Sequence, residues 1–427
     1  MKPRLTLTEG SITIEIYGGY GEIGGNCVVV KDKDRKVVFD NGIRFQALRR
    51  YYRGRIQPLG VGELRDLGVI PPLSVFEDAD AVYISHFHLD HLGLLGAIPP
   101  NVKVYVPSLD ILSVIENWYE GVPTWLAELP HKLYTEVREV KPYAEDDLGV
   151  TPIPVSHSAF PSYAFLYRGF DRSVFYSGDL RVRGPLGVRV DTLGNMGRVV
   201  DQRGVDIALL EGTNIHGVET PVGPEEFRGM LNNVIMSGGL VTISIDPLDF
   251  ELFTAISELA LLSGRKVVVA SPRLADTLTR WDLGSWEHMP ELAIAVELEK
   301  PVSIPVPVSY VSLKEDVLRS PTEYLLIQDP IGFLEMLRQM RIWREKLPAN
   351  TIAVLTTPEP LEAESRVEEE ILAIWLYMMS VQVYRIRLSG HYYPHELKSI
   401  LQKLNPRRLV PIHTKYPKLM STIASIQ

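Results

Sequence analysis

The first half of the chain contains short segments in which apolar and polar residues alternate. Residues 11–17 (SITIEIY) alternate at almost every position, as expected for a strand with one buried face. Brief β-branched segments follow, and the Gly, Asp and Pro residues between them favour turns. We therefore expect strands at 26–30, 36–40, 81–85, 102–106, 150–155, 163–168, 173–179 and 206–212.

The pattern changes near residue 220, where apolar residues begin to recur at the spacing of helices. We expect helices at 224–239, 249–264, 272–281, 331–347 and 364–379, with strands at 240–246, 265–271, 323–329 and 351–356. This alternation is typical of an α/β domain with a parallel sheet. The last residues are expected to form the strand 381–389, the helix 395–404 and the strand 408–413.

Composition limits the classes of protein to consider. A chain of 427 residues exceeds one ordinary core, so two domains are expected. Cys27 is the only cysteine, which excludes a disulfide within the chain and a thiolate zinc site. The apolar runs are too short for a membrane span, and residues 1–11 lack the apolar segment of a secretory signal. We therefore expect a cytoplasmic protein that does not contact membranes.

Residues 85–93 (SHFHLDHLG) concentrate side chains that bind metals. His86 and His88 are two positions apart at the end of a predicted strand, so both imidazoles can point to one ion. Asp90 and His91 follow, before the helix-like residues 92–98, and a turn there can aim them at a second ion. Imidazole and carboxylate ligands suit zinc. A polar loop with chance histidines is the alternative, but the compact H-x-H-x-D-H spacing favours a metal site.

Further ligands must come from elsewhere, because one cluster cannot complete two coordination shells. His157, Asp179 and His413 each stand at the end of a predicted strand, where a rigid sheet can project them into one cleft. The glycines of residues 18–25 (GGYGEIGG) match G-x-G-x-x-G, but a strand follows them instead of the helix that a dinucleotide site needs. We expect them to form a hairpin turn near the active face.

The order of these motifs resembles the metallo-β-lactamase fold: H-x-H-x-D-H, then His157, then Asp179 in S-G-D. Asp40, at the end of a predicted strand, matches the first motif of that superfamily. The resemblance implies two zinc ions per chain, with Mn²⁺ or Mg²⁺ as substitutes. The residues it implies are His86, His88 and His157 for one ion, Asp90, His91 and His413 for the other, Asp179 as a bridge, and Asp40 as a residue that orients a ligand.

The α/β segment between Asp179 and His413 resembles the insertion of the β-CASP nucleases. The added motifs of that group are matched in order, at or just after strand ends, by Glu211, His391 and His413. Within the group, the likeness is greatest to ribonuclease J, and it rests on residues 18–26, S-G-H and P-I-H. The expected fold is a metallo-β-lactamase αββα sandwich with an inserted parallel-sheet β-CASP domain. The expected division is 1–210 and 381–427 for the first domain and 211–380 for the insertion.

The resemblance implies a zinc-dependent ribonuclease that hydrolyses single-stranded RNA, as a 5′-to-3′ exonuclease in RNA processing or decay. Two neighbouring ions can activate water and stabilise displacement at phosphorus, with Asp90 and Asp179 holding them. His391 is the candidate general acid and Glu211 its partner, with a surface salt bridge as the alternative interpretation of that pair. An endoribonuclease, a DNA nuclease, a small-molecule hydrolase and a non-catalytic RNA-binding subunit remain alternatives.

Contacts with RNA are expected at two places. Basic and aromatic residues alternate at Arg49, Arg50, Tyr51, Tyr52 and Arg53, which suits phosphate contact and base stacking, with a solvated loop over packed tyrosines as an equal alternative. Arg181 and Arg183 are also placed to face the phosphate backbone. Thr356 and Thr357 retain hydroxyls where ribonuclease J binds a 5′-phosphate, whereas Asp246, Asp249 and Glu251 add charges that repel phosphate. The resemblance further suggests a homodimer.

Overall fold

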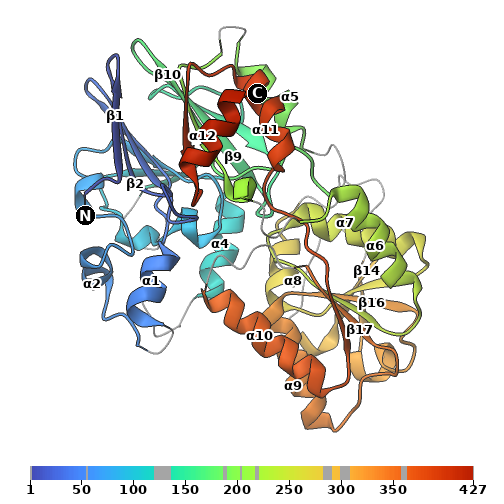
Figure 1. Cartoon of the computed structure of the whole chain (residues 1–427). Coiled ribbons are helices and arrows are strands. Elements are labelled where there is room, and N and C mark those ends of the chain that lie inside the picture. The colour runs from blue at the N-terminus through green and yellow to red at the C-terminus, as the bar shows by residue number, and fades with distance from the viewer. Residues whose placement is uncertain are drawn as a thin grey trace.

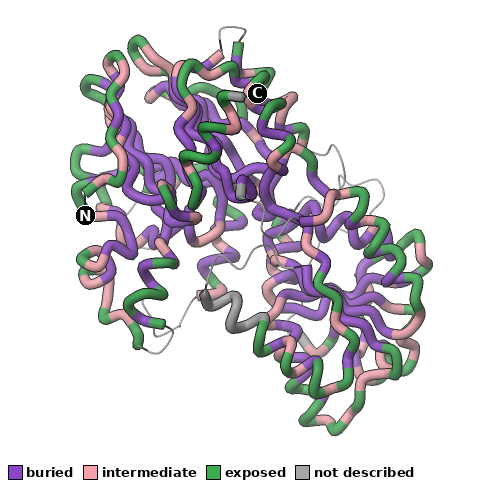
Figure 2. The backbone as a smooth tube through the Cα atoms, viewed as in Figure 1, coloured by how far each residue is buried: buried purple, intermediate pink, exposed green. Residues whose placement is uncertain are grey.

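The computed structural model describes residues 2–53, 56–119, 136–185, 190–201, 204–216, 221–281, 291–298, 308–356 and 363–426. The chain forms two lobes (Figure 1), and the C-terminal helices α11 (Leu397–Leu404) and α12 (Pro417–Ile426) return to the lobe that holds the N-terminus. Strands in the interior of both lobes are buried (Figure 2). Within the described ranges no helix is long and apolar enough to cross a membrane.

The first lobe contains two β-sheets. One has the order β1 to β7, formed by β1 (Leu5–Glu9), β2 (Ile12–Gly18), β3 (Cys27–Asp32), β4 (Arg35–Phe39), β5 (Ala81–Tyr83), β6 (Lys103–Val106) and β7 (Val137–Glu139). The other has the order β19-β11-β10-β9-β8, formed by β8 (Val150–Val155), β9 (Ser162–Arg168), β10 (Ser173–Tyr176), β11 (Ile207–Glu211) and β19 (Arg408–Ile412). β19 pairs in parallel with β11, so Arg408–Ile412 completes a sheet whose other strands lie at residues 150–211.

Aromatic side chains fill the space between the two sheets. The ring of Phe39 stacks on Tyr176 at a centroid distance of 5.1 Å and on Phe165 at 5.6 Å. All three are fully buried, and each such side chain contributes roughly 1.5–3 kcal/mol through burial. The outer faces are covered by α1 (Phe45–Tyr52), α2 (Val61–Asp66), α3 (Leu89–Leu92) and α4 (Leu109–Trp118) on one side and α5 (Thr192–Val199), α11 and α12 on the other. The predicted αββα sandwich is therefore confirmed.

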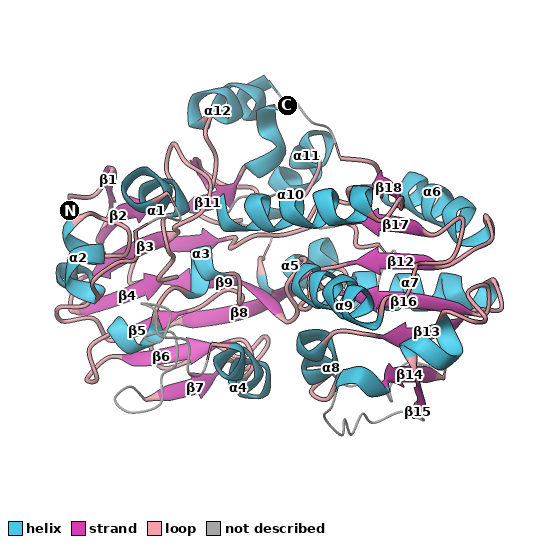
Figure 3. Cartoon of the chain, turned by 90° about the horizontal axis from the view of Figure 1, so that it is seen from below, coloured by secondary structure: helices cyan, strands magenta, loops and turns pink. Residues whose placement is uncertain are grey.

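The second lobe contains a parallel sheet with helices on both faces (Figure 3). Its order is β15 (Val308–Val311), β14 (Leu292–Ala295), β13 (Lys266–Val269), β16 (Tyr324–Gln328), β12 (Val241–Ser244), β17 (Ile352–Leu355) and β18 (Gln382–Arg385). The helices are α6 (Pro224–Met236), α7 (Phe250–Leu262), α8 (Pro272–Leu278), α9 (Pro330–Trp343) and α10 (Ala363–Met378). This is the parallel α/β architecture that the alternating pattern predicts, inserted between β11 and β19.

Local details differ from the expected elements. The predicted strand 381–389 pairs with β17 only over Gln382–Arg385, so the inserted sheet extends beyond residue 380. Residues 92–98 form only a 3₁₀ turn at Leu95–Ala97, and the α-helical turn lies earlier, in α3. The inserted domain therefore ends later than the predicted residue 380. The rest of the predicted division, with 1–210 and 381–427 in the first domain and 211–380 in the insertion, stays a proposal.

Candidate metal centre

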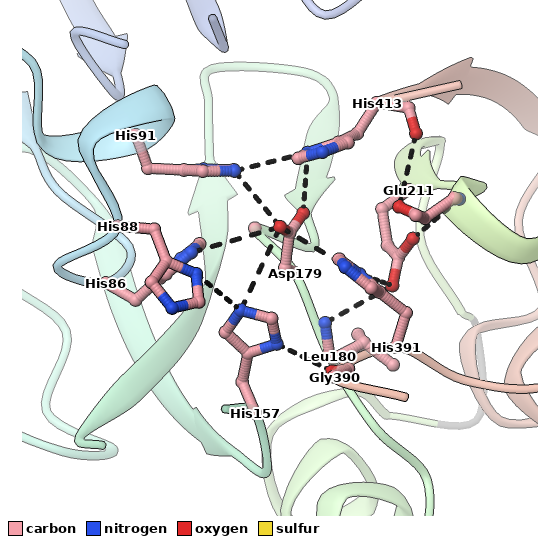
Figure 4. Close-up of polar contacts among 12 residues, drawn as sticks. His86, His88, His91, His157, Asp179, Leu180, Glu211, Gly390, His391 and His413 are labelled. Carbon is pink, nitrogen blue, oxygen red and sulfur yellow. Dashed lines mark hydrogen bonds and ion pairs between the residues drawn. The ribbon is translucent and has the colours of Figure 1, made fainter. Parts of the chain in front are cut away.

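The predicted ligands come from the ends of several strands. His86 and His88 follow β5, and Asp90 and His91 lie in α3 directly after them. His157 follows β8, Asp179 follows β10, and His413 follows β19. Figure 4 shows the five histidines of this set gathered around Asp179. Because the strand ends meet at one edge of the two sheets, residues far apart in sequence lie close together here.

His86, His88 and His157 form the first group of potential ligands. One nitrogen from each ring lies within 4.8 Å of one nitrogen from each of the others. His157 Nε2 and His88 Nδ1 are 3.2 Å apart. Two ligand atoms of one tetrahedral zinc ion, each at about 2.0–2.2 Å, lie roughly 3.3–3.6 Å apart. The His88–His157 separation is close to this range, and His86 lies near enough to join the same ion.

Asp90, His91 and His413 form the second group, and their ligand-type atoms also lie within 4.8 Å of one another. His91 Nε2 is 3.1 Å from His413 Nδ1, and His413 Nε2 is 3.7 Å from Asp90 Oδ2. Asp179 lies between the two groups. Its Oδ2 is 3.1 Å from His91 Nε2, 3.9 Å from His86 Nε2 and 4.0 Å from His157 Nε2. A carboxylate in this position can reach both groups.

The chemistry of these atoms fits divalent cations. Among the described residues, His86 Nε2, Asp90 Oδ2 and His413 Nε2 are buried without a hydrogen-bond partner. Leaving such atoms unpaired is costly, and cations bound by the two groups would satisfy them. Burial lowers the pKa of His86 and of His157 well below the ordinary value. Both rings are therefore neutral near pH 7, which is the form that binds metals.

Asp179 and His91 are coupled charges at the centre of the site. Burial by itself lowers the pKa of His91, but the carboxylates of Asp179, Asp90 and Asp40 outweigh it and hold the pKa well above the ordinary value. Burial raises the pKa of Asp179, but His413, His91 and His391 outweigh it and hold the pKa well below the usual range. Asp179 is therefore a carboxylate that attracts positive charge from several sides.

Asp40 lies behind His91, as the resemblance implied for a residue that orients a ligand. Its Oδ2 is 2.7 Å from His91 Nδ1 and accepts a hydrogen bond of 2.5 Å from the Tyr176 hydroxyl. The Ser85 backbone N–H donates to Oδ1 over 2.7 Å. A carboxylate on Nδ1 fixes the tautomer and turns Nε2 of His91 towards Asp179.

Glu211 and His391 form a pair beside Asp179. His391 Nδ1 is 3.1 Å from Glu211 Oε1 and 3.9 Å from Asp179 Oδ2. Glu211 is the last residue of β11, and its Oε2 accepts a hydrogen bond of 2.9 Å from the Thr213 backbone N–H. Both members of the pair are buried, so the alternative of a surface salt bridge is wrong.

The glycine-rich segment 18–25 packs against the second group of ligands. A Cβ on Gly24, whose φ is +78°, would lie 2.7 Å from Asp90 Oδ2. The Gly19 carbonyl accepts a hydrogen bond of 2.5 Å from the His413 backbone N–H. Gly42 shows the same close approach, because its Cβ would lie 1.8 Å from the Asp90 carbonyl oxygen. Sequence reasoning placed the segment near the active face but missed this support for Asp90 and His413.

The predicted RNA-contact residues at 49–53 do not form a loop. Residues up to Tyr52 belong to α1, which exposes Arg49, Arg50 and Tyr51 and is followed by the exposed Arg53. The Arg50 guanidinium lies 5.7 Å from the centre of the Tyr51 ring, which is 42% exposed. Tyr52 is only 5% exposed and packs in the core. Its predicted role in base stacking is wrong, because the helix turns it inwards.

The other predicted RNA contacts are also partly corrected. The buried Thr356 hydroxyl donates to the Ser244 carbonyl over 2.6 Å, so it is engaged within the inserted sheet. Thr357 lies outside the described residues. Arg181 is buried and pairs with Asp249 over 2.8 Å, so it does not face the phosphate backbone as expected. Arg183 is exposed.

Comparisons with known proteins agree with this architecture. Residues 62–219 match the family model described as the beta-lactamase superfamily domain. Residues 377–426 match the model described as the Zn-dependent metallo-hydrolase RNA specificity domain. The first match contains most of the candidate ligands, and the second contains His391 and His413.

Similar proteins match over most of their length. Ribonuclease J of Pyrococcus abyssi is 26% identical over 95% of this chain and 91% of its own. Ribonuclease J of Methanocaldococcus jannaschii is 24% identical over 94% of this chain and 91% of its own. A solved structure of a protein of unknown function from Enterococcus faecalis has a TM-score of 0.71 at 21% identity and covers 96% of both chains, which shows the fold. The chain thus contains the two metallo-hydrolase domains that these models describe, and it resembles ribonuclease J over most of its length.

Proposed function

We propose that this chain is a zinc-dependent ribonuclease that hydrolyses phosphodiester bonds of single-stranded RNA. The observation that carries the proposal is the convergence of two groups of ligand-type side chains on Asp179, with the Glu211–His391 pair beside them. The match to an RNA specificity domain and the similarity to proteins named ribonuclease J support RNA as the substrate.

The proposed ligands divide between two ions. We assign one to His86, His88 and His157 and the other to Asp90, His91 and His413, with Asp179 shared. Imidazole and carboxylate donors suit zinc, and Mn²⁺ would be the nearest substitute, since Mg²⁺ prefers oxygen ligands. When bound, two such ions would supply Lewis-acid stabilisation of a phosphate and a nucleophilic water at neutral pH.

The protein residues contribute orientation and proton transfer. Asp40 fixes the ring of His91 through Nδ1, so that Nε2 stays directed at the centre. Glu211 holds His391 through Nδ1. Because Nδ1–H donates to Glu211, the ring gains and loses its second proton at Nε2. His391 is therefore our candidate for the group that donates a proton to the leaving ribose oxygen.

The mode of cleavage is a finer part of the proposal. The resemblance to ribonuclease J favours a 5′-to-3′ exonuclease. Two observations favour an endonuclease as the second candidate: the Thr356 hydroxyl is engaged by the Ser244 carbonyl, and the carboxylate of Asp246 lies close to His88. Neither arrangement offers a donor to a 5′-phosphate. A cytoplasmic location and a homodimer stay predictions from the resemblance.

One cleavage assay tests the function and the mode together. Internally labelled single-stranded RNA with a 5′-monophosphate, a 5′-triphosphate or a 5′-hydroxyl is incubated with the protein and zinc or manganese. Mononucleotides released fastest from the monophosphate would support the exonuclease, and internal fragments from all three would support the endonuclease. The blank is the variant His86→Ala with Asp90→Ala. Cleavage no faster than this blank, with metal bound, would overturn the ribonuclease proposal, and a parallel assay with single-stranded DNA tests substrate preference.

A further inference from the structure

A turn of the inserted domain contacts the loops that carry the candidate ligands. The turn runs from Asp246 to Glu251, between β12 and the first turn of α7. Its residues reach the loop of His88, the loop of His157 and the loop of Asp179. Figure 1 shows α7 in the inserted lobe, at the side that faces the first lobe.

The first contact joins Asp246 to His88. Asp246 Oδ2 lies 3.6 Å from His88 Nε2, whereas Nδ1 of the same ring lies 3.2 Å from His157 Nε2. Nδ1 is therefore the nitrogen that faces the proposed ion, and the carboxylate stands behind the ring. At 3.6 Å the contact is longer than a hydrogen bond, so Asp246 acts on the ring through its charge, which stabilises the positive charge that the imidazole shares with a bound cation.

The second contact is a buried charge pair. Arg181, two residues after Asp179, pairs with Asp249 over 2.8 Å, and its Nε donates to the Ser389 carbonyl over 2.7 Å. Both charged side chains are 2% exposed. Arg181 therefore connects the loop of Asp179 and the loop before His391 to the N-terminus of α7.

The third contact involves the loop of His157. The Ser156 hydroxyl donates to Glu251 Oε1 over 2.7 Å, and the Phe160 backbone N–H donates to the Leu248 carbonyl over 2.9 Å. These bonds lie on either side of His157 in sequence. The loop is thus held to the inserted domain at both ends.

We propose that the Asp246–Glu251 turn positions the metal centre, with Asp246 holding His88 and the Arg181–Asp249 pair holding the loop of Asp179. Metal affinity then depends on the docking of the inserted domain. The three acidic residues of this turn, which would repel phosphate in a substrate pocket, act here on His88, Arg181 and Ser156. This inference rests on the proposed metal site and not on the substrate.

The direct test measures zinc affinity of the full chain by competition with a chromophoric chelator, without RNA. Asp246→Asn keeps the shape of the side chain but removes its charge, and we expect zinc affinity to fall about 10- to 100-fold with an unchanged melting temperature of the metal-free protein. The matched control is Glu323→Gln, an exposed carboxylate of the same domain, which should bind zinc like the parent. If Asp246→Asn binds zinc as tightly as the parent, Asp246 does not position His88. This conclusion holds even if the variant binds RNA more tightly than the parent.

A second variant tests the buried pair. Arg181→Met with Asp249→Ser removes both charges of this pair and leaves the nearby buried Glu251 carboxylate hydrogen-bonded to Ser156. Ser can still cap α7 as Asp249 does through the Leu252 N–H. We expect weaker zinc binding and faster hydrogen exchange in 156–160 and 177–183. Parent-like affinity and exchange would refute the coupling. Neither zinc affinity nor hydrogen exchange is measured with RNA. The role of the turn can therefore be refuted while the ribonuclease proposal stands, and the ribonuclease proposal can be refuted while the role of the turn stands.

Discussion

The candidate ligands and the basic segment of α1 differ in how distance along the sequence relates to distance in the folded chain. The ligands are scattered from His86 to His413, yet their ligand-type atoms lie within a few ångströms of one another. The residues from Arg49 to Arg53 are consecutive, yet the structure separates them into an exposed set and the buried Tyr52. Strand ends meet at one sheet edge, whereas a helix rotates successive side chains by about 100°, so closeness in sequence does not place side chains on one surface.

The contrast extends to energy. The ligand atoms are buried polar groups that the fold holds at a cost, as expected where function requires them. The exposed residues of α1 carry no such cost and can change with little effect on folding. The following variants test this difference, beginning with the largest expected effect.

Asp179→Asn should abolish most of the activity. The change removes the charge that both groups of ligands share, and with it several kcal/mol of transition-state stabilisation. We expect RNA hydrolysis to fall about 10⁴-fold, measured at saturating zinc. Metal analysis should show less zinc per chain, while circular dichroism shows a folded protein. Full activity in this variant would remove Asp179 from the centre.

Tyr52→Ala should differ sharply from Tyr51→Ala in stability. The loss of a buried aromatic ring costs about 3–5 kcal/mol, whereas an exposed substitution usually changes stability by no more than about 0.5 kcal/mol. Urea denaturation of both variants measures the difference. Similar stabilities would mean that the two tyrosines are equivalent and that the contrast within α1 is false.

His391→Gln should separate catalysis from metal binding. Loss of a general acid lowers kcat by about 10²-fold, and the zinc content should stay that of the parent because His391 is not among the proposed ligands. The pH profile of kcat in both proteins provides the second readout. If zinc is lost in parallel with activity, His391 is a ligand and not a proton donor.

Arg49→Ala with Arg50→Ala should have the smallest effect and leave stability unchanged. If these side chains contact phosphate, the slope of log affinity for single-stranded RNA against log salt should decrease by about 1 for each contact. Fluorescence anisotropy with an Asp179→Asn background prevents cleavage during the titration. The control is Arg338→Ala, an exposed arginine on α9. An unchanged slope would leave α1 as a solvated surface helix.

Much of the architecture could be predicted from local pattern. Period-two alternation and β-branched segments indicate strands, and the change near residue 220 indicates the parallel α/β insertion. The H-x-H-x-D-H spacing and the strand-end positions of His157, Asp179 and His413 identified side chains that the fold does bring together. These predictions succeed because strand direction and ligand chemistry are properties of short segments.

Other features depended on contacts across the chain. Whether Arg181 faces solvent or is buried depends on Asp249, which lies 68 positions later and in another domain. The roles of Asp246 and Glu251 depend on the loops of His88 and His157, and the close approach of Gly24 to Asp90 depends on how two loops pack. Residue type and spacing therefore determined the chemistry available to this protein. Only the tertiary structure decided which charges are paired and buried, because those energies depend on distance and solvent exposure and not on sequence order.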